Sequence, residues 1–168
     1  RRDEIKTPIS ITRKLTMQKH KITTDGTKNF TDLDEELKLT INKENFVGNV
    51  TGEDQFNNTI TAKAATYLGD IVTGSGDDSV KIAVQKESQV SLNLGDGDAT
   101  VKLRAKDNND VILTTGDGDA TVKLRAKDNN DVILTTGDGE STNVKATIGE
   151  GSSFVAHLGS SDKLIDLK

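Results

Sequence analysis

The sequence lacks several residue types on which small globular folds depend. It contains no cysteine and no tryptophan, and only 3% of its 168 residues are aromatic and 32% hydrophobic. Without cysteine there is no disulfide framework, and the apolar content is too low for the packed core of an ordinary globule of this length. A repeat architecture, whose core is one layer of side chains thick, tolerates this composition.

Long apolar runs are missing as well. No stretch approaches the roughly 18 apolar residues of a membrane-spanning helix, and Arg1-Arg2-Asp3-Glu4 does not begin a signal peptide, so we expect a soluble fragment with no membrane span. The formal net charge of −5 predicts solubility and no general attraction to nucleic acid. The absence of cysteine suits export in an unfolded state and suits a cytosolic protein equally well.

What the sequence does contain is a perfect tandem repeat of 21 residues. Gly95–Thr115 reads GDGDATVKLRAKDNNDVILTT, and Gly116–Thr136 repeats it without a change. The same phase extends to divergent segments that begin at Gly74 and at Gly137, the second with one extra residue. A unit this short cannot bury an apolar face alone, so it must stack on neighbours of its own kind. The identity of the two copies indicates that one is recent, through natural duplication or an engineered insertion.

Each repeat contains two runs, 99–105 and 110–115, in which apolar and polar residues alternate as they do in strands. Alternation predicts that one set of side chains faces the core. In the first perfect repeat and the unit before it, this set comprises Val101, Leu103, Ala105, Val111, Leu113 and Thr115, together with Val80, Ile82, Val84, Val90, Leu92 and Leu94. We therefore predict an all-β parallel β-solenoid (a β-helix or β-roll) with five to seven coils of about 21 residues.

The strength of the repeat divides the chain into four regions. They are an N-terminal cap or linker (1–31), degenerate coils (32–73), regular repeats (74–158) and a C-terminal strand or cap (159–168). Residues between Ile9 and Met17 alternate as in a strand, and Asp25-Gly26 is typical of a hairpin turn. We therefore expect an N-terminal hairpin that caps the open edge of the solenoid.

One turn resembles a known calcium-binding repeat. Thr73–Lys81 reads TGSGDDSVK, which resembles the nonapeptide G-G-x-G-x-D-x-U-x of the RTX family of secreted bacterial proteins and departs at the first glycine. The resemblance implies a β-roll whose glycine-aspartate turns bind Ca²⁺ between coils, and a location outside the cell or on its surface. The next two turns keep both glycines but have Ala99 and Ala120 at the ligating position. The longer period is more similar to that of autotransporter or filamentous adhesin β-helices.

Parallel stacking also predicts columns of turn carboxylates. Equivalent residues of successive coils lie about 4.8 Å apart, where like charges repel by about 1 kcal/mol in water, and Ca²⁺ would offset this repulsion. The candidate metal ligands are Asp77, Asp78, Asp96, Asp98, Asp117, Asp119 and Asp138. The alternative is that these are solvated turn residues, since Asp and Gly tolerate left-handed backbone angles.

Two further columns follow from the register. Lys81, Lys102 and Lys123 form a candidate strip for a glycan or surface polyanion, or alternatively a solvated strand face. The pairs Asn108-Asn109 and Asn129-Asn130 are placed to form amide ladders.

Together these features predict a structural or spacer segment of a secreted or surface bacterial protein, either monomeric or assembled end to end. We do not expect an enzyme, because His20 and His157 have no serine or cysteine partner in the pattern. Two alternatives remain open. One is a Ca²⁺-binding RTX-type domain that folds on export, and the other is a carbohydrate-acting β-helix such as a lyase or tailspike, which the single tyrosine and lack of tryptophan disfavour.

Overall fold

The computed structural model describes residues 17–31, 35–52, 54–160 and 162–168, which form two parallel β-sheets and no helix. Sheet A comprises β1 (Met17–Ile22), β3 (Glu36–Asn42), β6 (Asn58–Ala64), β8 (Asp78–Lys86), β10 (Ala99–Asp107), β12 (Ala120–Asp128), β14 (Ser141–Ile148) and β16 (Asp162–Leu167). Sheet B comprises β2 (Lys28–Asn29), β4 (Asn45–Val47), β5 (Val50–Thr51), β7 (Thr66–Val72), β9 (Gln89–Asn93), β11 (Asp110–Thr114), β13 (Asp131–Thr135) and β15 (Ser153–His157).

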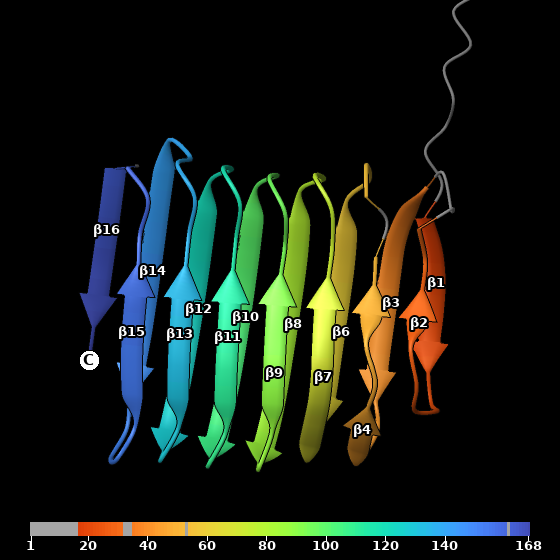
Figure 1. Ribbon diagram of the computed structural model, residues 1–168, viewed down its shortest axis with the longest axis horizontal. Coiled ribbons are helices and arrows are strands. Elements are labelled where there is room, and N and C mark those ends of the chain that lie inside the picture. The colour runs from red at the N-terminus through yellow and green to blue at the C-terminus, as the bar shows by residue number, and fades with distance from the viewer. Residues whose placement is uncertain (1–16, 32–34, 53, 161) are drawn as a thin grey trace, which may run out of the picture.

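The chain alternates between the two sheets, so each strand pairs with the strands one coil before and one coil after it. Every pairing is parallel, and Figure 1 shows the coils side by side, with sheet B in front of sheet A. About seven turns result, which confirms the predicted β-solenoid with coils of about 21 residues. No helix that could span a membrane is found in the described ranges.

The register is the one that the repeat predicts. Val101 pairs with Val80 on one side and with Val122 on the other, and Leu113 pairs with Leu92 and Leu134 in the same way. The extra residue after Gly137 is accommodated in the turn, because Val122 pairs with Val144. Identical side chains therefore stack directly on one another through the middle of the molecule.

The core lies between the two sheets and consists of stacked columns of small apolar side chains. All the core positions predicted for the two units beginning at Gly74 and Gly95 are buried. The outward partners behave as alternation requires, since Ile112 is 49% exposed and Ile133 41%. Earlier coils use larger side chains in the same space, and the rings of Phe46 and Tyr67 stack with centroids 4.9 Å apart.

The turn that follows each long strand of sheet A depends on a left-handed residue. Asn108 and Asn129 have φ angles of 53° and 52°, and Glu87 has 50° at the equivalent point of the preceding coil. Asparagine adopts this conformation at low cost because its short polar side chain tolerates it. The strand can therefore reverse toward sheet B within a few residues.

Of the two asparagines predicted to form amide ladders in each turn, the second does so inside the solenoid, whereas Asn108 and Asn129 are exposed. Asn109 and Asn130 are fully buried, and the Asn130 Oδ1 accepts hydrogen bonds from the Asn109 backbone N–H (3.1 Å) and side-chain Nδ2 (2.8 Å). Ser88 continues the ladder on one side and Ser152 on the other. Buried amide groups must be paired to avoid a desolvation cost, so this column fixes the spacing of the coils at this corner.

The opposite turn depends on glycines that stack on one another. A Cβ atom on Gly118 would overlap the carbonyl group of Gly97 in the coil before, and a Cβ on Gly97 would overlap that of Gly76. Gly118 does not have a positive φ, so its requirement for glycine comes from the close approach of two backbones.

The predicted N-terminal hairpin is wrong for the part of it that the structure describes. Met17–Ile22 pairs in parallel with Glu36–Ile41, and Lys28–Asn29 pairs in parallel with Val50–Thr51. These strands are the first coil of the solenoid, and Asp25-Gly26 turns the chain from sheet A to sheet B. The segment from Ile9 to Leu15 lies outside the described residues. The cause of the difference is that a tight turn can join two sheets as well as two neighbouring strands.

The predicted C-terminal strand is present as β16, parallel to β14. Ile165 continues the column of Val144, and Leu167 continues that of Ala146. Both are about half exposed because they form the outermost strand of sheet A.

Candidate functional site

Six of the seven predicted metal ligands lie in the turns that lead from sheet B to sheet A, and five of these six accept hydrogen bonds from backbone N–H groups. The Asp77 carboxylate accepts a hydrogen bond from the backbone N–H of Asp98 (3.1 Å), and the Asp98 carboxylate accepts one from Asp119 N–H (2.9 Å). The Asp119 carboxylate accepts one from Ser141 N–H (2.8 Å). Each carboxylate therefore joins its own coil to the following one.

The second acidic column is built in the same way. Asp117 accepts a hydrogen bond from the Asp138 backbone N–H (3.0 Å). Asp138 accepts hydrogen bonds from the Ser160 backbone N–H (2.7 Å) and hydroxyl (3.0 Å), which lower the pKa of this carboxyl below its usual value. Asp96 occupies the equivalent position one coil earlier, where its carboxylate lies against Gly116. Backbone N–H groups thus supply the favourable interaction that offsets part of the repulsion within the column.

Asp78, the residue that matches the RTX ligand position, lies in a different environment from the other six candidates. It is 2% exposed and lies in the interior column shared with Asn58, Ala99 and Ala120. Its Oδ1 accepts hydrogen bonds from the backbone N–H and the side-chain Nδ2 of Asn58, both 2.8 Å long. Its Oδ2 and the nearby Thr73 Oγ1 are buried without a well-formed hydrogen bond.

The seven candidates do not converge on a common point. Within the described ranges, no three acidic or histidine side chains are grouped as a metal ion would require. A Ca²⁺ ion needs six to eight oxygen ligands around it, whereas six of these carboxylates are spread along the turns and Asp78 points into the core. The described side chains therefore do not by themselves form a calcium cage.

Burial raises the pKa of Asp78 above its usual value, and the polar contacts with Thr73 and Asn58 oppose this only in part. A carboxyl that binds its proton more tightly in the folded state stabilises the fold below the unfolded pKa of 3.8, and this contribution is lost as the pH rises through the folded pKa. Near neutral pH the charged Asp78 is consequently a destabilising residue.

We expect Asp78→Asn to raise the free energy of unfolding at neutral pH by on the order of 1 kcal/mol, since an unsatisfied buried polar atom costs about 1–3 kcal/mol. The amide keeps an acceptor for Asn58 and places a donor beside Thr73. The gain should shrink as the pH falls through the raised folded pKa of Asp78 and should be smallest below 3.8, where the carboxyl is protonated in both the folded and the unfolded state, as measured by urea unfolding over a pH series. Asp110→Asn, which removes an exposed carboxylate on sheet B, controls for charge removal. An Asp78→Asn gain that is independent of pH would contradict this explanation.

The predicted lysine column is part of a much larger cationic face. We use this name for the exposed Lys and Arg side chains on the outer surface of sheet A: Lys19, Lys21, Lys38, Lys63, Lys81, Lys102, Arg104, Lys106, Lys123, Arg125, Lys127 and Lys145. Lys81, Lys102, Lys123 and Lys145 pair directly in the register, and Arg104 pairs with Arg125. Alternation along 99–106 predicts that Lys102, Arg104 and Lys106 share a face, but the extension into the first three coils has no counterpart in the perfect repeat.

The cations of this face have few acidic partners. In the described part of the chain, Lys145 is the one member that forms an ion pair, with Asp166 at 3.1 Å. Neighbouring cations in a column are about one strand spacing apart, and like charges at about 4.8 Å repel by about 1 kcal/mol in water and more near a protein surface. The face therefore carries an electrostatic cost that a bound anion would relieve.

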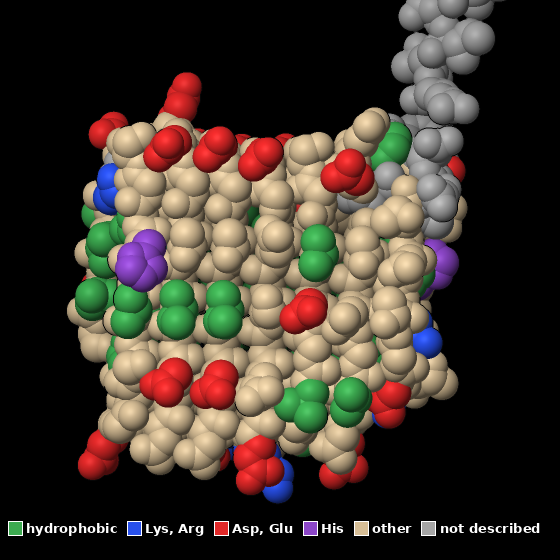
Figure 2. Space-filling view, viewed as in Figure 1, with side chains coloured by type: hydrophobic (Ala, Val, Ile, Leu, Met, Phe, Trp, Pro, Cys, Tyr) green, Lys and Arg blue, Asp and Glu red, His purple; other side chains and the backbone are tan. Residues whose placement is uncertain are grey.

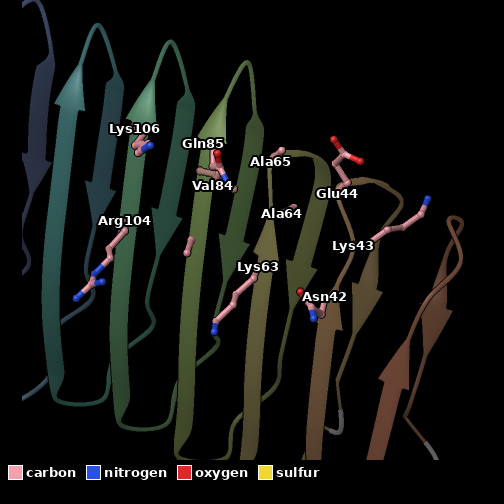
Figure 3. A pocket seen from close by; sticks show the side chains of 11 residues that line it. Asn42, Lys43, Glu44, Lys63, Ala64, Ala65, Val84, Gln85, Arg104 and Lys106 are labelled. Carbon is pink, nitrogen blue, oxygen red and sulfur yellow. The ribbon is translucent and has the colours of Figure 1, made fainter.

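A shallow hollow interrupts the cationic face at the coils of β6, β8 and β10. Its volume is about 620 Å³, and Ala65 and Ala83 contribute small side chains to it. Figure 3 shows Lys63, Arg104 and Lys106 projecting around this region. Lys43, at its far side, forms an ion pair with Asp25. Lys43, Lys63, Arg104 and Lys106 line the hollow together with Glu44, so cations outnumber the one carboxylate around the small apolar side chains. This arrangement suits a ligand with an anionic substituent near Arg104 and a partly apolar ring.

The outer surface of sheet B has the opposite character. Outward positions of β9, β11, β13 and β15 hold Asp, Ser, Thr, Asn, Gln, Ile, Val and His, and none of them is Lys or Arg. Figure 2 shows this face with acidic side chains along the turns and a short row of hydrophobic ones. Although the net charge is −5, the molecule has one cationic face, on sheet A, and one neutral to acidic face, on sheet B.

The two histidines lie at opposite ends of the solenoid. His20, in β1, stacks on Phe30 with ring centroids 4.8 Å apart and forms a 3.2 Å hydrogen bond with Gln18. His157 is exposed in β15 and pairs in the register with Thr135. His157 therefore continues the outward column of Thr135, Thr114 and Asn93.

Searches against protein-family models, curated proteins and solved structures found no match to this chain. The resemblance of Thr73–Lys81 to the RTX nonapeptide therefore remains a prediction from the sequence.

Proposed function

We propose that this chain is a structural spacer, a rigid segment that sets the distance between parts of a larger protein on or outside a bacterial cell. The observation that supports the role is the uninterrupted parallel register from β1 to β16, in which every coil rests on the one before. A stack of this kind resists bending because each coil adds backbone hydrogen bonds and buried apolar area to its neighbours. A location on or outside a bacterial cell is supported by one feature, the turn that resembles the RTX repeat of secreted bacterial proteins.

The spacer role predicts a fixed increase in length for each added coil. We expect insertion of further copies of Gly95–Thr115 after Thr115 to lengthen the folded particle by about 4.8 Å per copy, which is the separation of neighbouring strands. Small-angle X-ray scattering on variants with one to three added copies measures this increment. A maximum dimension that grows irregularly, or a particle that expands as an unfolded chain does, would count against a rigid spacer.

Calcium binding by the acidic turns is the competing proposal, and the stacked columns of Asp96 and Asp98 and their copies favour it. Against it, the carboxylates with described hydrogen bonds already accept backbone amides, and the group does not converge. We therefore expect millimolar Ca²⁺ to leave the melting temperature and the β-sheet circular dichroism signal unchanged relative to EDTA. A rise in melting temperature with Ca²⁺ that EDTA reverses would instead favour the calcium-dependent domain.

A further inference from the structure

The exposed cations of the described chain are concentrated on one narrow strip. The column of Lys81, Lys102 and Lys123 and the column of Lys106 and Lys127 are four residues apart along the strands, which corresponds to about 13 Å. Along the solenoid axis the cationic face extends from β1 to β14, six strand spacings or about 29 Å. The strip is thus about 13 Å wide in the central coils, and Lys19 and Lys38, which lie in the column of Thr100, widen the face to six residues or about 20 Å over its whole length.

Acidic side chains border this strip at both ends of the strands. Asp98 and Asp119 lie in the turns that precede β10 and β12, and Asp107 and Asp128 end those strands. A polyanion placed parallel to the strands would meet these carboxylates, whereas one placed along the solenoid axis would meet at least one lysine on each strand of sheet A from β1 to β14. The charge pattern therefore favours one narrow anionic chain that runs perpendicular to the strands.

We propose that the cationic face binds a linear anionic polysaccharide, with carboxylate or sulfate groups, that lies along the solenoid axis. The identical coils of β10 and β12 offer the same three cations at one strand spacing, and each other strand of the face from β1 to β14 adds one or two, so cations recur along the axis as charged groups recur along a polymer. This inference goes beyond the spacer role, because a spacer needs no ligand.

The hollow next to Arg104 provides a place for one sugar unit. Ala65 and Ala83 leave room for the ring, and Lys63, Arg104 and Lys106 project around it. Glu44 lines the hollow beside Lys43, so the anionic substituent belongs on the side of Arg104 and Lys106. An arginine side chain binds carboxylate or sulfate through two parallel hydrogen bonds, which gives orientation as well as attraction. The same column has Arg125 in the next coil, so a second anionic group of the polymer has an equivalent partner.

A polysaccharide suits this face better than a nucleic acid does. Proteins that bind single strands stack the bases on aromatic side chains, and the outward positions of β3, β6, β8, β10, β12 and β14 contain no aromatic residue. A duplex is broad, and the bordering carboxylates together with the net charge of −5 oppose it. The binding test therefore includes an oligonucleotide, so that nucleic acid and polysaccharide can be distinguished as ligands.

The test compares a heparin dodecasaccharide and an oligogalacturonate of similar length with neutral dextran and with a single-stranded oligonucleotide of matched charge. Binding is measured by isothermal titration calorimetry at several salt concentrations. We expect both anionic oligosaccharides to bind, dextran not to bind, and the affinity to fall steeply with salt through counterion release. Failure of both oligosaccharides to bind at low salt, or tighter binding of the oligonucleotide, would overturn the proposal.

Two double variants, each of which makes the net charge more negative by two, test which face binds the oligosaccharide. Lys102→Gln with Lys123→Gln removes two cations from the cationic face, and we expect a loss of affinity of at least about tenfold and a salt slope smaller by about two, one per cation. Thr114→Glu with Thr135→Glu makes the same change in net charge on sheet B, and it should leave affinity within about twofold because exposed charges on the far face are screened. Equal losses in both variants would contradict a site on sheet A.

A second double lysine variant tests whether a loss of affinity arises from misfolding. Lys106→Gln with Lys127→Gln changes the same two coils at the other side of the strip and should also weaken binding, with circular dichroism confirming that each variant keeps its β-sheet. Unchanged affinity in both folded lysine variants would overturn the proposal, while the scattering test of the spacer role would be unaffected.

Discussion

A protein in which Gly116–Thr136 has been excised should fold into a shorter solenoid. The excision joins Thr115 to Gly137, so Val101 comes to pair with Val144 and Asn109 comes to face Ser152, which are the contacts that Val122 and Asn130 make now. Every column is preserved, because one whole coil is lost. We expect cooperative unfolding with a smaller m-value, since m scales with the surface exposed on unfolding.

The control excision removes a stretch that is not a whole coil. Deleting residues 116–125 joins Thr115, just after β11, to the last three residues of β12 and leaves no complete strand of sheet A in that coil. We expect this variant to lose cooperative unfolding and most of its β-sheet circular dichroism signal, because no alternative register pairs the buried columns. Comparable stability of the two variants, measured by urea unfolding, would show that the coils are not independent modules.

Replacing Gly118 by alanine should destabilise the protein by about 3 kcal/mol or more, since overpacking typically costs about 1–3 kcal/mol and here the obstacle is backbone. The added Cβ would overlap the carbonyl group of Gly97. To make room, the two coils must separate and lose hydrogen bonds on both sides of the turn. Urea unfolding of the single variant measures the loss.

Gly26→Ala is the matched control, because it separates the two reasons for glycine. Gly26 has a φ of 98° and no atom within 4 Å of an added Cβ, so the substitution tests backbone conformation without a steric overlap. We expect a cost of about 1–3 kcal/mol, as for other residues held in sparsely populated backbone regions. A loss at Gly118 smaller than the loss at Gly26 would refute close stacking as the reason for the glycine column.

The register of the central coils could be predicted from the sequence because the repeat is perfect and its alternation is strict. Residues 21 apart, such as Val101 and Val122, have no other way to bury the same face in every copy. The first coil could not be predicted in this way, since 17–29 shares few letters with the repeat. Its Asp25-Gly26 turn is compatible with a hairpin and with a corner of the solenoid, and long-range pairing decides between them.

For Asp78 the nonapeptide motif and the repeat periodicity predict different environments. The motif predicts a ligand in a turn, whereas the position two residues before the buried Val80 predicts a side chain that points into the core, as Val80 does. That inward direction was available from the sequence, whereas the hydrogen bonds from Asn58 were not, because the step from Asn58 to Asp78 is 20 residues and breaks the period.

The full extent of the cationic face could not be predicted from the repeat either, because the early coils depart from its period. Its central columns follow from the repeat, but Lys19, Lys38 and Lys63 belong to coils whose steps are irregular. The net charge does not indicate a cationic face, because acidic residues outnumber lysines and arginines in the whole sequence.

The stacking of the coils also determines how the molecule would respond to tension. Each strand pairs only with strands of the neighbouring coils, so a pull on the two ends of the solenoid would peel coils from the ends while the middle stays folded. Each coil of 21 residues would release about 70 Å of extended chain, at about 3.3–3.6 Å per residue. Unfolding under load would therefore lengthen the molecule by one coil at a time, in steps of similar size.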